Sequence, residues 1–320
     1  MKDLIILGNG MAGMTAALYA KRANLDFKIV GRDEYDFGQI ANAVCVENFP
    51  CATPQSGMDL AISLHDQLID NDIQIEEHEV TKITQVMINH YGLSFHIDYA
   101  DGTDDFCKTV IYALGASHRK LNCEIEEGVP IHYCAVCDGA FYKDKTVAVI
   151  GGGDVAFTEA EYLSKICKQV FIIMCDENIT ASPSITERVK NISNIDIYFN
   201  TPIDEICKDR DGKINICSTY VEKQHFGEDI VRKRTFVFEK LGIFVAIGMI
   251  PNTQSIVQSS PIITDTLGYI QTDENCKTKI DGFFAAGDVR AKSVRQAVTA
   301  AADGANAVNS VITYLKRVSK

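Results

Sequence analysis

Two cysteines separated by two residues, Cys134 and Cys137, are the strongest candidates for chemistry in this sequence. They form the only Cys-x-x-Cys pattern among its eleven cysteines. A two-residue spacer at the start of a helix brings two sulfur atoms within reach of a disulfide bond. The helix N-terminus also lowers the pKa of a thiol, so that thiolate is present near neutral pH. The pair is therefore predicted to be a redox-active disulfide.

Two other roles of this pair stay open. Structural zinc normally needs a second cysteine pair or nearby histidines, and His132 is the one histidine close in the sequence. Buried, unreactive thiols are the other alternative, since most cysteines of a reducing compartment pack as small apolar side chains. We favour the redox role and expect no bound metal.

A glycine-rich loop near the N-terminus has the pattern of a dinucleotide site, Gly-x-Gly-x-x-Gly. It contains Gly8, Gly10, Met11, Ala12 and Gly13. An apolar run at 4–7 precedes the loop and helix-forming residues at 14–22 follow it. In this context backbone N–H groups and the helix N-terminus can meet a pyrophosphate, and a glycine turn without ligand is the alternative. The next predicted strand, 27–30, is followed by Asp33 and Glu34, so ribose recognition by an acid is left open.

A second unit of the same kind begins near residue 146. Its loop contains Gly151, Gly153, Asp154, Val155 and Ala156. The predicted strand at 147–150 precedes this loop, a helix follows to about Cys167, and the next strand spans 170–174. The chain is thus predicted to contain two dinucleotide-binding folds.

An internal repeat indicates how the two folds are connected. Residues 111–115 (IYALG) and 245–248 (VAIG) both read as a buried strand that ends on glycine. We therefore expect an α/β protein with two Rossmann-like three-layer dinucleotide-binding domains, the second inserted into the first. The predicted outer domain comprises residues 1–114 and 247–320, and the predicted inserted domain comprises residues 115–246.

A third polar segment lies near the C-terminus. A predicted strand that starts at Phe283 ends in Gly287 and Asp288, and this acid can accept a hydrogen bond from a ribityl hydroxyl. An ordinary aspartate between strand and turn is the alternative. Arg295, Gln296 and Ala297 follow at the expected start of an apolar helix, whose N-terminus can face the electron-rich carbonyl edge of a flavin.

These motifs occur in an order that resembles the low-molecular-weight thioredoxin reductases over nearly the whole chain. They are GNGMAG at 8–13, GQI at 38–40, ENFP at 47–50, CAVCDG at 134–139, GGGDVA at 151–156, AIGMIPNT at 246–253, AAGDVR at 285–290 and RQAVTAAADG at 295–304. The resemblance implies that the outer domain binds FAD. It also implies that the inserted domain carries a nicotinamide site and the redox disulfide.

The resemblance implies roles for single residues as well. FAD would contact the first glycine loop, Gln39, Asn48, Gly287, Asp288 and the 295–297 segment. Gln39 and Asn48 can instead cap loops. Cys137 would face the flavin and Cys134 would attack the partner's disulfide, while Asp138 would be the proton donor and acceptor or, alternatively, a helix cap.

One departure from the family concerns the nicotinamide donor. Family members that use NADPH follow the strand after the second glycine loop with a basic His-Arg-Arg-x-x-x-Arg cluster, whereas residues 174–180 here contain no basic residue. Three readings stay open: Asp176 or Glu177 accepts the ribose hydroxyls of NADH, NADPH is used weakly, or another donor such as ferredoxin reduces the flavin. Both acids can also be simply solvated at the end of a strand. We favour NADH.

The predicted enzyme passes electrons from its donor through FAD and Cys134–Cys137 to a thioredoxin-like protein. The resemblance implies a homodimer whose inserted domain rotates about hinges near Gly115 and Gly248. A small-molecule dithiol oxidase and a non-catalytic flavin sensor are the alternatives. The net charge of −12 argues against nucleic acid, and the longest apolar runs are far shorter than the ~20 residues of a membrane helix. We expect a cytoplasmic protein that binds no membrane.

Overall fold

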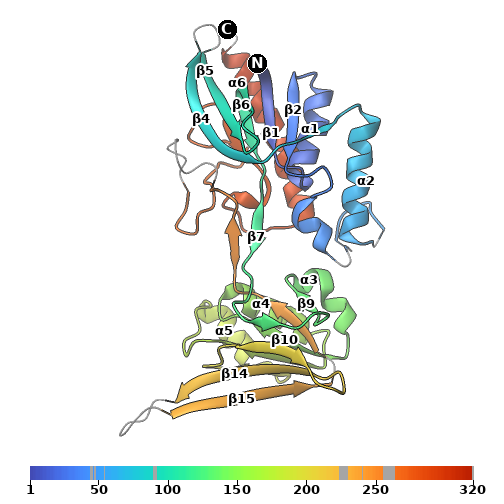
Figure 1. Ribbon diagram of the computed structural model, residues 1–320, viewed down its shortest axis with the longest axis vertical. Helices are drawn as coiled ribbons and strands as arrows, with labels where there is room; N and C mark the ends of the chain where they lie inside the picture. Colours follow the sequence, from blue (N-terminus) through green and yellow to red (C-terminus); the bar gives the residue numbers. More distant parts are fainter. Residues whose placement is uncertain are drawn as a thin grey trace. The chain divides into compact units, whose positions relative to one another are not determined.

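The computed structural model describes residues 1–43, 46, 48–53, 55–88, 92–222, 230–239, 241–254 and 264–318. The chain folds into two compact units (Figure 1). Unit 1 comprises Met1–Ser117 and Ile250–Lys320, and unit 2 comprises His118–Met249, so unit 2 is inserted into the sequence of unit 1. Strands β7 (Ala116–His118) and β17 (Met249–Pro251) pair with each other where the chain enters and leaves unit 2.

Unit 1 is built on a seven-stranded sheet. Its parallel part contains β1 (Lys2–Leu7), β2 (Phe27–Gly31), β3 (Ile75–Glu77), β6 (Asp104–Tyr112) and β18 (Phe283–Ala285). Its antiparallel part contains β4 (Val80–Ile88) and β5 (Gly92–Tyr99), which continue from β6. The strand order is β3-β2-β1-β6-β5-β4, with β18 beside β6.

The apolar run of β1 is buried on both faces, as the central strand of a parallel sheet requires. Leu4 and Ile6 belong to the core shared with helices α1 (Met11–Arg22), α2 (Gly57–Asp70) and α6 (Ala297–Val318). Ile5 and Leu7 belong to a second core, which the antiparallel strands cover. Unit 1 is therefore layered as helices, parallel sheet and antiparallel strands.

Unit 2 has the same three-layer plan. Its parallel sheet has the order β12-β11-β10-β16-β9, formed by β9 (Ile131–His132), β10 (Thr146–Ile150), β11 (Gln169–Ile173), β12 (Ile195–Tyr198) and β16 (Leu241–Val245). Helices α4 (Asp154–Ser164) and α5 (Pro183–Lys190) share one core with it. A four-stranded sheet covers the other core and contains β8 (Glu124–Ile125), β13 (Glu205–Lys208), β14 (Ile214–Glu222) and β15 (Ile230–Phe238).

The structure confirms the predicted α/β fold class and refines some element ends. Helix α4 ends at Ser164, three residues before the predicted Cys167, because the amides of Lys165 and Ile166 already bond in turns to the carbonyls of residues three positions before them. Helix α6 begins at Ala297, so Arg295 and Gln296 precede the helix.

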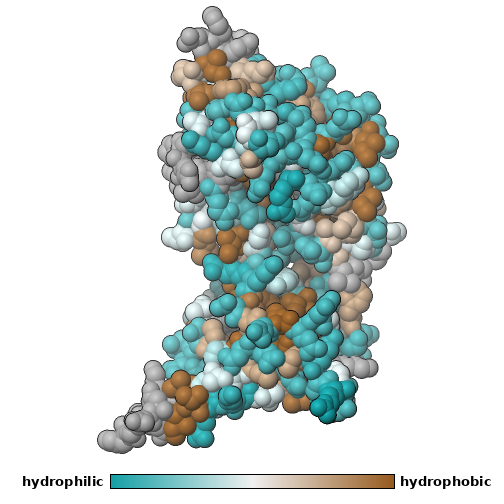
Figure 2. Space-filling model, in the orientation of Figure 1, coloured by the Kyte–Doolittle hydropathy of each residue, from teal (hydrophilic) through white to brown (hydrophobic). Residues whose placement is uncertain are grey.

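The visible face of the molecule is largely polar, with apolar side chains in separate areas (Figure 2). Among the helices that the structure describes, none has both the length and the apolar character needed to cross a membrane.

Candidate active site: a redox disulfide and two dinucleotide loops

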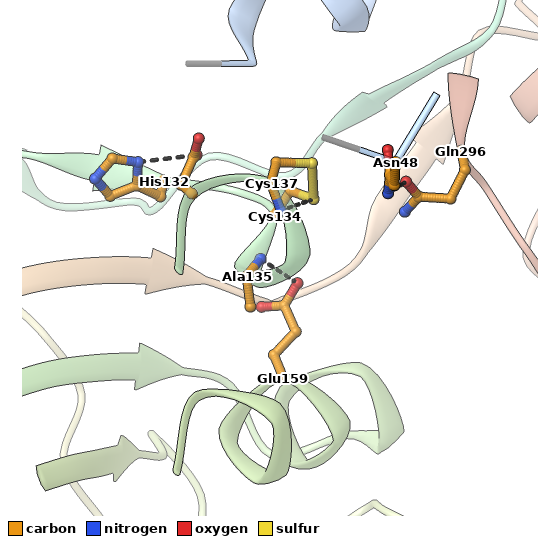
Figure 3. Close-up of a disulfide and its surroundings, with 8 residues drawn as sticks. Asn48, His132, Cys134, Ala135, Cys137, Glu159 and Gln296 are labelled. Atoms are coloured by element: carbon orange, nitrogen blue, oxygen red, sulfur yellow. Dashed lines mark hydrogen bonds and ion pairs between the residues drawn. A yellow bond between two sulfur atoms is a disulfide. The ribbon is translucent and has the colours of Figure 1, made fainter. Parts of the chain in front are cut away.

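Cys134 and Cys137 form a disulfide at the start of a short helix in unit 2 (Figure 3). The helix, α3, spans Ala135–Asp138, and the Cα atoms of the two cysteines are 5.3 Å apart. Cys134 is the N-cap residue, and its Sγ accepts a hydrogen bond from the backbone N–H of Cys137 at 3.2 Å. Both cysteines are half-buried. The arrangement keeps one disulfide accessible at a helix start, as thiol–disulfide exchange requires.

Asp138, the residue after the disulfide, is buried with 4% of its surface exposed. Its carboxylate oxygen Oδ2 lies 2.9 Å from Nδ1 of His132 (Figure 3), and Nε2 of His132 lies 2.7 Å from the hydroxyl of Tyr142. Tyr142 closes the 3-10 helix η2 (Gly139–Tyr142). Sequence reasoning considered His132 only as a zinc ligand and missed Tyr142. The sequence pattern of apolar residues does not reveal these contacts, because β9, α3 and η2 come together only in the folded unit.

Glu159 lies on the other side of the disulfide segment and was also missed. Its Oε1 accepts a hydrogen bond from the backbone N–H of Ala135 at 3.3 Å (Figure 3). Its Oε2 is buried and has no hydrogen-bond partner among the described residues. Burial, followed by the negative charge of Asp138, raises the pKa of Glu159 to about 7, against the opposing effect of the Ala135 hydrogen bond. The sequence contained a signal, since Glu159 falls between Ala156 and Leu163 on the apolar face of a helix.

The first glycine loop connects β1 to α1 and has little room for side chains. Gly8 has a φ of 105°, and a Cβ there would lie 2.5 Å from the carbonyl oxygen of Ala113. A Cβ on Gly13 would overlap the carbonyl oxygen of Gly8. Gly10 differs, because the nearest atom to an added Cβ is the Phe37 carbonyl oxygen at 3.5 Å, an ordinary contact.

The start of α1 fits a pyrophosphate. Gly10 is its N-cap and supplies no side-chain hydrogen bond, and the first turn contains no acidic residue. Met11 and Ala12 occupy the first turn, where backbone N–H groups lack partners within the helix. Such N–H groups, together with the helix dipole, favour an anion.

The other predicted FAD residues lie elsewhere in unit 1. Asn48 and Gln296 meet across 248 residues of sequence, with Asn48 Nδ2 donating to Gln296 Oε1 at 3.1 Å (Figure 3). Gln39 lies half-buried in the 3-10 helix η1 (Gly38–Asn42). Glu47, part of the ENFP motif, lies outside the described residues.

Asp288 belongs to a charged network that sequence reasoning missed. The 3-10 helix η3 (Gly287–Val289) follows β18, and Lys292 Nζ lies 3.1 Å from Asp288 Oδ1. The same Nζ lies 3.1 Å from Oδ2 of Asp303 on α6, and Asp303 Oδ1 pairs with Arg290 at 2.6 Å. Asp303 Oδ2 also accepts the backbone N–H of Gly287 at 3.1 Å. The network therefore fixes the turn that presents Asp288.

Arg295 lies over an aromatic ring before α6 begins. Its guanidinium carbon lies 4.0 Å from the centroid of Tyr269. Its Nε is buried and has no hydrogen-bond partner among the described residues. Ala297 then opens the helix, while the amide of Gln296 donates to Thr299 Oγ1 at 3.2 Å.

The second glycine loop connects β10 to α4 and repeats the tight geometry of the first. Gly151 has a φ of 145°, and a Cβ there would overlap the carbonyl oxygen of Ala246. Gly153 is the N-cap of α4 without a side-chain bond, and the nearest atom to an added Cβ is Thr180 Oγ1 at 3.6 Å. Val155 is exposed, whereas Ala156 is fully buried.

The segment after β11 folds back onto this loop. The amides of Thr180 and Ala181 donate to the carbonyl of Gly152 at 2.9 and 3.0 Å. Asp154 Oδ1 accepts the backbone N–H of Ser182 at 2.7 Å, and this hydrogen bond lowers the pKa of Asp154. The carboxylate of Asp154 is thus already engaged by its own chain.

Two hollows lie beside the returning segment. The first has a volume of about 400 Å³ and is lined by Cys175, Asp176, Glu177, Asn178, Thr180 and Asn200. The second has a volume of about 470 Å³, and its lining includes Glu177 and Lys190. Lys190 comes from the end of α5, and the sequence did not reveal it because it lies well beyond the segment 174–180 that follows β11. Arg188, its neighbour on α5, is already paired with Glu161, with two N···O distances of 3.1 Å.

The corresponding strand end in unit 1 is differently occupied. Asn9 Nδ2 donates to the carbonyls of Asp33 and Glu34 at 2.8 and 3.1 Å. Glu34 Oε1 lies 3.1 Å from Nε2 of His65. Asp33 Oδ1 accepts the amide of Tyr35 at 2.8 Å. The side chains of Asp33 and Glu34 are therefore both engaged in hydrogen bonds within unit 1.

Comparisons with known proteins agree with this architecture. Residues 2–304 match the family described as pyridine nucleotide-disulphide oxidoreductase. The chain is 36% identical over 322 residues to a thioredoxin reductase of Listeria monocytogenes, covering 99% of this chain and 95% of the relative. It is 35% identical over 317 residues to one of Treponema pallidum, covering 98% and 97%. The crystal structure of thioredoxin reductase from Streptococcus pyogenes MGAS5005 superimposes with a TM-score of 0.82, at 35% identity and 99% coverage of both chains.

Proposed function

The chain belongs to the pyridine nucleotide-disulphide oxidoreductase family, among its thioredoxin reductases, and we propose that it carries electrons from NADH to a thioredoxin-like protein disulfide. The chain is an FAD-dependent disulfide oxidoreductase. The observation that carries the proposal is the Cys134–Cys137 disulfide. It lies in the same unit as a glycine loop that leads into a helix whose N-cap makes no side-chain hydrogen bond. The relatives are named thioredoxin reductase, which supports the thioredoxin-like partner.

In this proposal unit 1 holds FAD. The residues present fit the cofactor, because the uncapped start of α1 suits a pyrophosphate and Gly10 leaves room for it. Asp288 would accept a hydrogen bond from a hydroxyl of the ribityl chain, and the backbone before α6 would face the flavin ring. Asn48 and Gln296 would contact the cofactor as a bonded pair. When bound, FAD supplies a two-electron carrier between a nicotinamide and a disulfide.

Unit 2 contributes the residues that exchange thiols. We assign Cys137 to the flavin side and Cys134 to attack on the partner's disulfide. Asp138 would give and take the proton of a sulfur, and its burial limits competing exchange with water. Two thiols form for each pair of electrons, so two protons must be supplied for each disulfide reduced.

The preference for NADH rests on the charges at the end of β11. Asp176 and Glu177 line the hollow beside the second glycine loop, where the adenosine ribose would lie. The 2′-phosphate of NADPH carries about two negative charges, and its approach to these acids would cost on the order of 1 to 3 kcal/mol. That is roughly a tenfold to hundredfold preference for NADH. A ribose hydroxyl can donate a charge-assisted hydrogen bond to either carboxylate.

The test is anaerobic stopped-flow reduction of the FAD-bound protein by NADH, by NADPH and by reduced ferredoxin. Faster flavin bleaching with NADH supports the proposal. Faster bleaching with NADPH contradicts the charge argument. Bleaching by ferredoxin alone would assign the alternative donor. Peroxide production from a small dithiol without nicotinamide would instead indicate a dithiol oxidase, and bound FAD that reduces no disulfide with any donor would indicate a sensor.

We expect the active protein to be a homodimer, as the family resemblance implies. Sedimentation equilibrium of the FAD-bound protein gives the mass that decides this point.

A further inference from the structure

We propose that Asp138, His132 and Tyr142 form a proton relay between the redox disulfide and solvent, with His132 as its positioning residue. The proposal rests on the proposed function, because it concerns the protons that accompany disulfide reduction. The buried acid next to Cys137 needs a route by which its proton is replaced. The three side chains are joined by consecutive short contacts within unit 2.

The two ring nitrogens of His132 are both engaged. Nδ1 lies 2.9 Å from Asp138 Oδ2, and Nε2 lies 2.7 Å from the hydroxyl of Tyr142. A neutral imidazole has one donor and one acceptor nitrogen, so a coherent arrangement is required. Either Tyr142 donates to Nε2 while Nδ1–H donates to the carboxylate, or a protonated Asp138 donates to Nδ1 while Nε2–H donates to the phenol oxygen. The relay is the exchange between these two arrangements.

The ring of His132 is fixed in this orientation by its surroundings. It stacks on Phe244 of β16, with ring centroids 5.1 Å apart and an interplanar angle of 28°. Tyr142 meets the same Phe244 edge to face, with centroids 5.7 Å apart. Gly242, two residues earlier on β16, makes room for Tyr142, because a Cβ there would overlap the tyrosine ring. The strand therefore accommodates the tyrosine and holds the histidine against it.

Asp138 is the least exposed of the three residues. Its side chain is 6% exposed and that of His132 is 12% exposed, while Tyr142 is half-buried. A route through Tyr142 and His132 would bring a proton to an acid that water contacts very little. Burial and the charge of Asp138 raise the pKa of Tyr142, so its hydroxyl stays protonated and acts as a donor.

Two further charges face the relay. Glu159 of α4 acts on Asp138 from the other side of α3 and hydrogen-bonds to Ala135. Lys145 Nζ lies 5.6 Å from the ring centroid of Tyr142 and donates to the carbonyl of Phe141. The relay is thus bordered by an acidic side chain beside Asp138 and by a lysine at its tyrosine end.

Breaking the S–S bond with two electrons leaves two thiolates, which take up two protons. FAD, when reduced by NADH, would supply one of these protons together with the electron pair, and the relay supplies the other. The relay starts from the arrangement in which Nδ1–H of His132 donates to the Asp138 carboxylate. The hydroxyl proton of Tyr142 passes to Nε2, the Nδ1 proton passes to the carboxylate, and Asp138 gives that proton to a thiolate. Water then returns a proton to Tyr142, so one proton has moved from solvent to sulfur. When the partner protein reoxidises the dithiol, one proton leaves by the reverse path and restores the proton on Nδ1.

The test is a single anaerobic turnover in which the FAD-bound protein receives one equivalent of NADH and no partner protein. Alkylation and mass spectrometry follow the appearance of Cys134 and Cys137 thiols. We expect His132→Gln to slow thiol formation roughly tenfold or more, while the rate of flavin bleaching stays unchanged. In His132→Ala, added imidazole should restore the rate in proportion to its concentration. Tyr142→Phe removes the hydroxyl that faces Nε2 of His132. This variant should also slow thiol formation and change how its rate depends on pH.

The matched control is His118→Gln, since His118 lies in the same unit but stacks on Tyr133. This variant should behave as wild type. Wild-type rates across the pH range in His132→Gln would overturn the relay, as would a slow His132→Ala protein that imidazole does not rescue. Failure of the proposed function looks different, because the wild-type protein itself would then form no Cys134 and Cys137 thiols.

Discussion

The two glycine loops of this protein share a pattern but differ in what lies beyond them. Gly8 and Gly151 both adopt positive φ angles, and a Cβ added to either would clash with a backbone carbonyl oxygen, of Ala113 and Ala246 respectively. In unit 1 the acids after the next strand, Asp33 and Glu34, form hydrogen bonds with residues of the same unit, as the Glu34 contact with His65 shows. In unit 2 the corresponding acids line an open hollow. In the proposed function, each loop would bind a pyrophosphate, and the end of the next strand would decide which dinucleotide is preferred.

The helices that follow the loops differ in the same way. Ala16 and Glu159 each lie eight positions after the first glycine of their loop. Ala16 is fully buried and its amide lies close to Gly304 of α6, where a Cβ would come within 3.0 Å. Glu159 instead reaches the amide of Ala135 beneath the disulfide. One helix is therefore adapted to close packing, and the other to the redox segment.

The largest expected effect comes from filling the two loops separately. Gly10→Val should still fold, because its Cβ has ordinary contacts, but should lose FAD because the side chain occupies the space of the pyrophosphate. Gly153→Val should keep about one FAD per chain, but its flavin should be reduced by NADH roughly tenfold or more slowly than in wild type. Flavin absorbance per chain and stopped-flow bleaching measure the two effects. Full flavin content in Gly10→Val would refute the assignment of the first loop.

The second prediction concerns Glu159, whose pKa is raised to about 7. A raised pKa means that the folded state binds the proton more tightly than the unfolded state. The contribution of Glu159 to the free energy of unfolding is therefore fully present below the ordinary pKa of 4.5 and is lost as pH rises through about 7. Glu159→Gln removes this loss. Relative to wild type it should gain on the order of 1 to 3 kcal/mol between pH 5 and pH 8.5. Urea unfolding of the FAD-saturated proteins at several pH values measures it.

The control for this measurement is Glu161→Gln on the same helix. Glu161 is paired with Arg188, which lowers its pKa, so the variant should gain no stability at high pH. Parallel pH profiles for wild type and Glu159→Gln would show that the carboxylate is not buried in solution.

The third prediction exchanges acids for bases at the two strand ends. Asp176→Arg should shift the ratio of NADH to NADPH rates towards NADPH by about tenfold, because a cation replaces an anion beside the 2′ position. Asp33→Arg changes the equivalent strand end of unit 1 and should leave that ratio unchanged. Steady-state rates with each nucleotide decide between them, and equal shifts in both variants would remove the distinction between the loops.

The smallest expected effect belongs to Lys190. It lines the second hollow with Glu177, and we expect it to support whatever weak NADPH activity the protein has. Lys190→Ala should lower the NADPH rate by about threefold and leave the NADH rate unchanged, as for one partly exposed charge. A larger loss with NADH than with NADPH would place the lysine in a different role.

The sequence predicted most of what depends on local pattern. Apolar runs beside glycine loops marked β1, α1, β10 and α4, since a parallel strand and its helix each leave a periodic signal. The disulfide followed from its own spacing. The partners of the site did not, because His132, Tyr142 and Glu159 come from separate elements that meet only after folding. The network of Asp303 with Arg290 and Lys292 was likewise invisible, although an acid inside an apolar helix was a sign of it.

The most direct test of electron flow follows both redox centres in one anaerobic turnover. The protein is mixed with one equivalent of NADH, flavin absorbance is recorded, and free thiols are alkylated at intervals and mapped. The flavin should bleach and then recover its colour as Cys134 and Cys137 become alkylated. A flavin that stays reduced while both cysteines resist alkylation would contradict transfer through this disulfide.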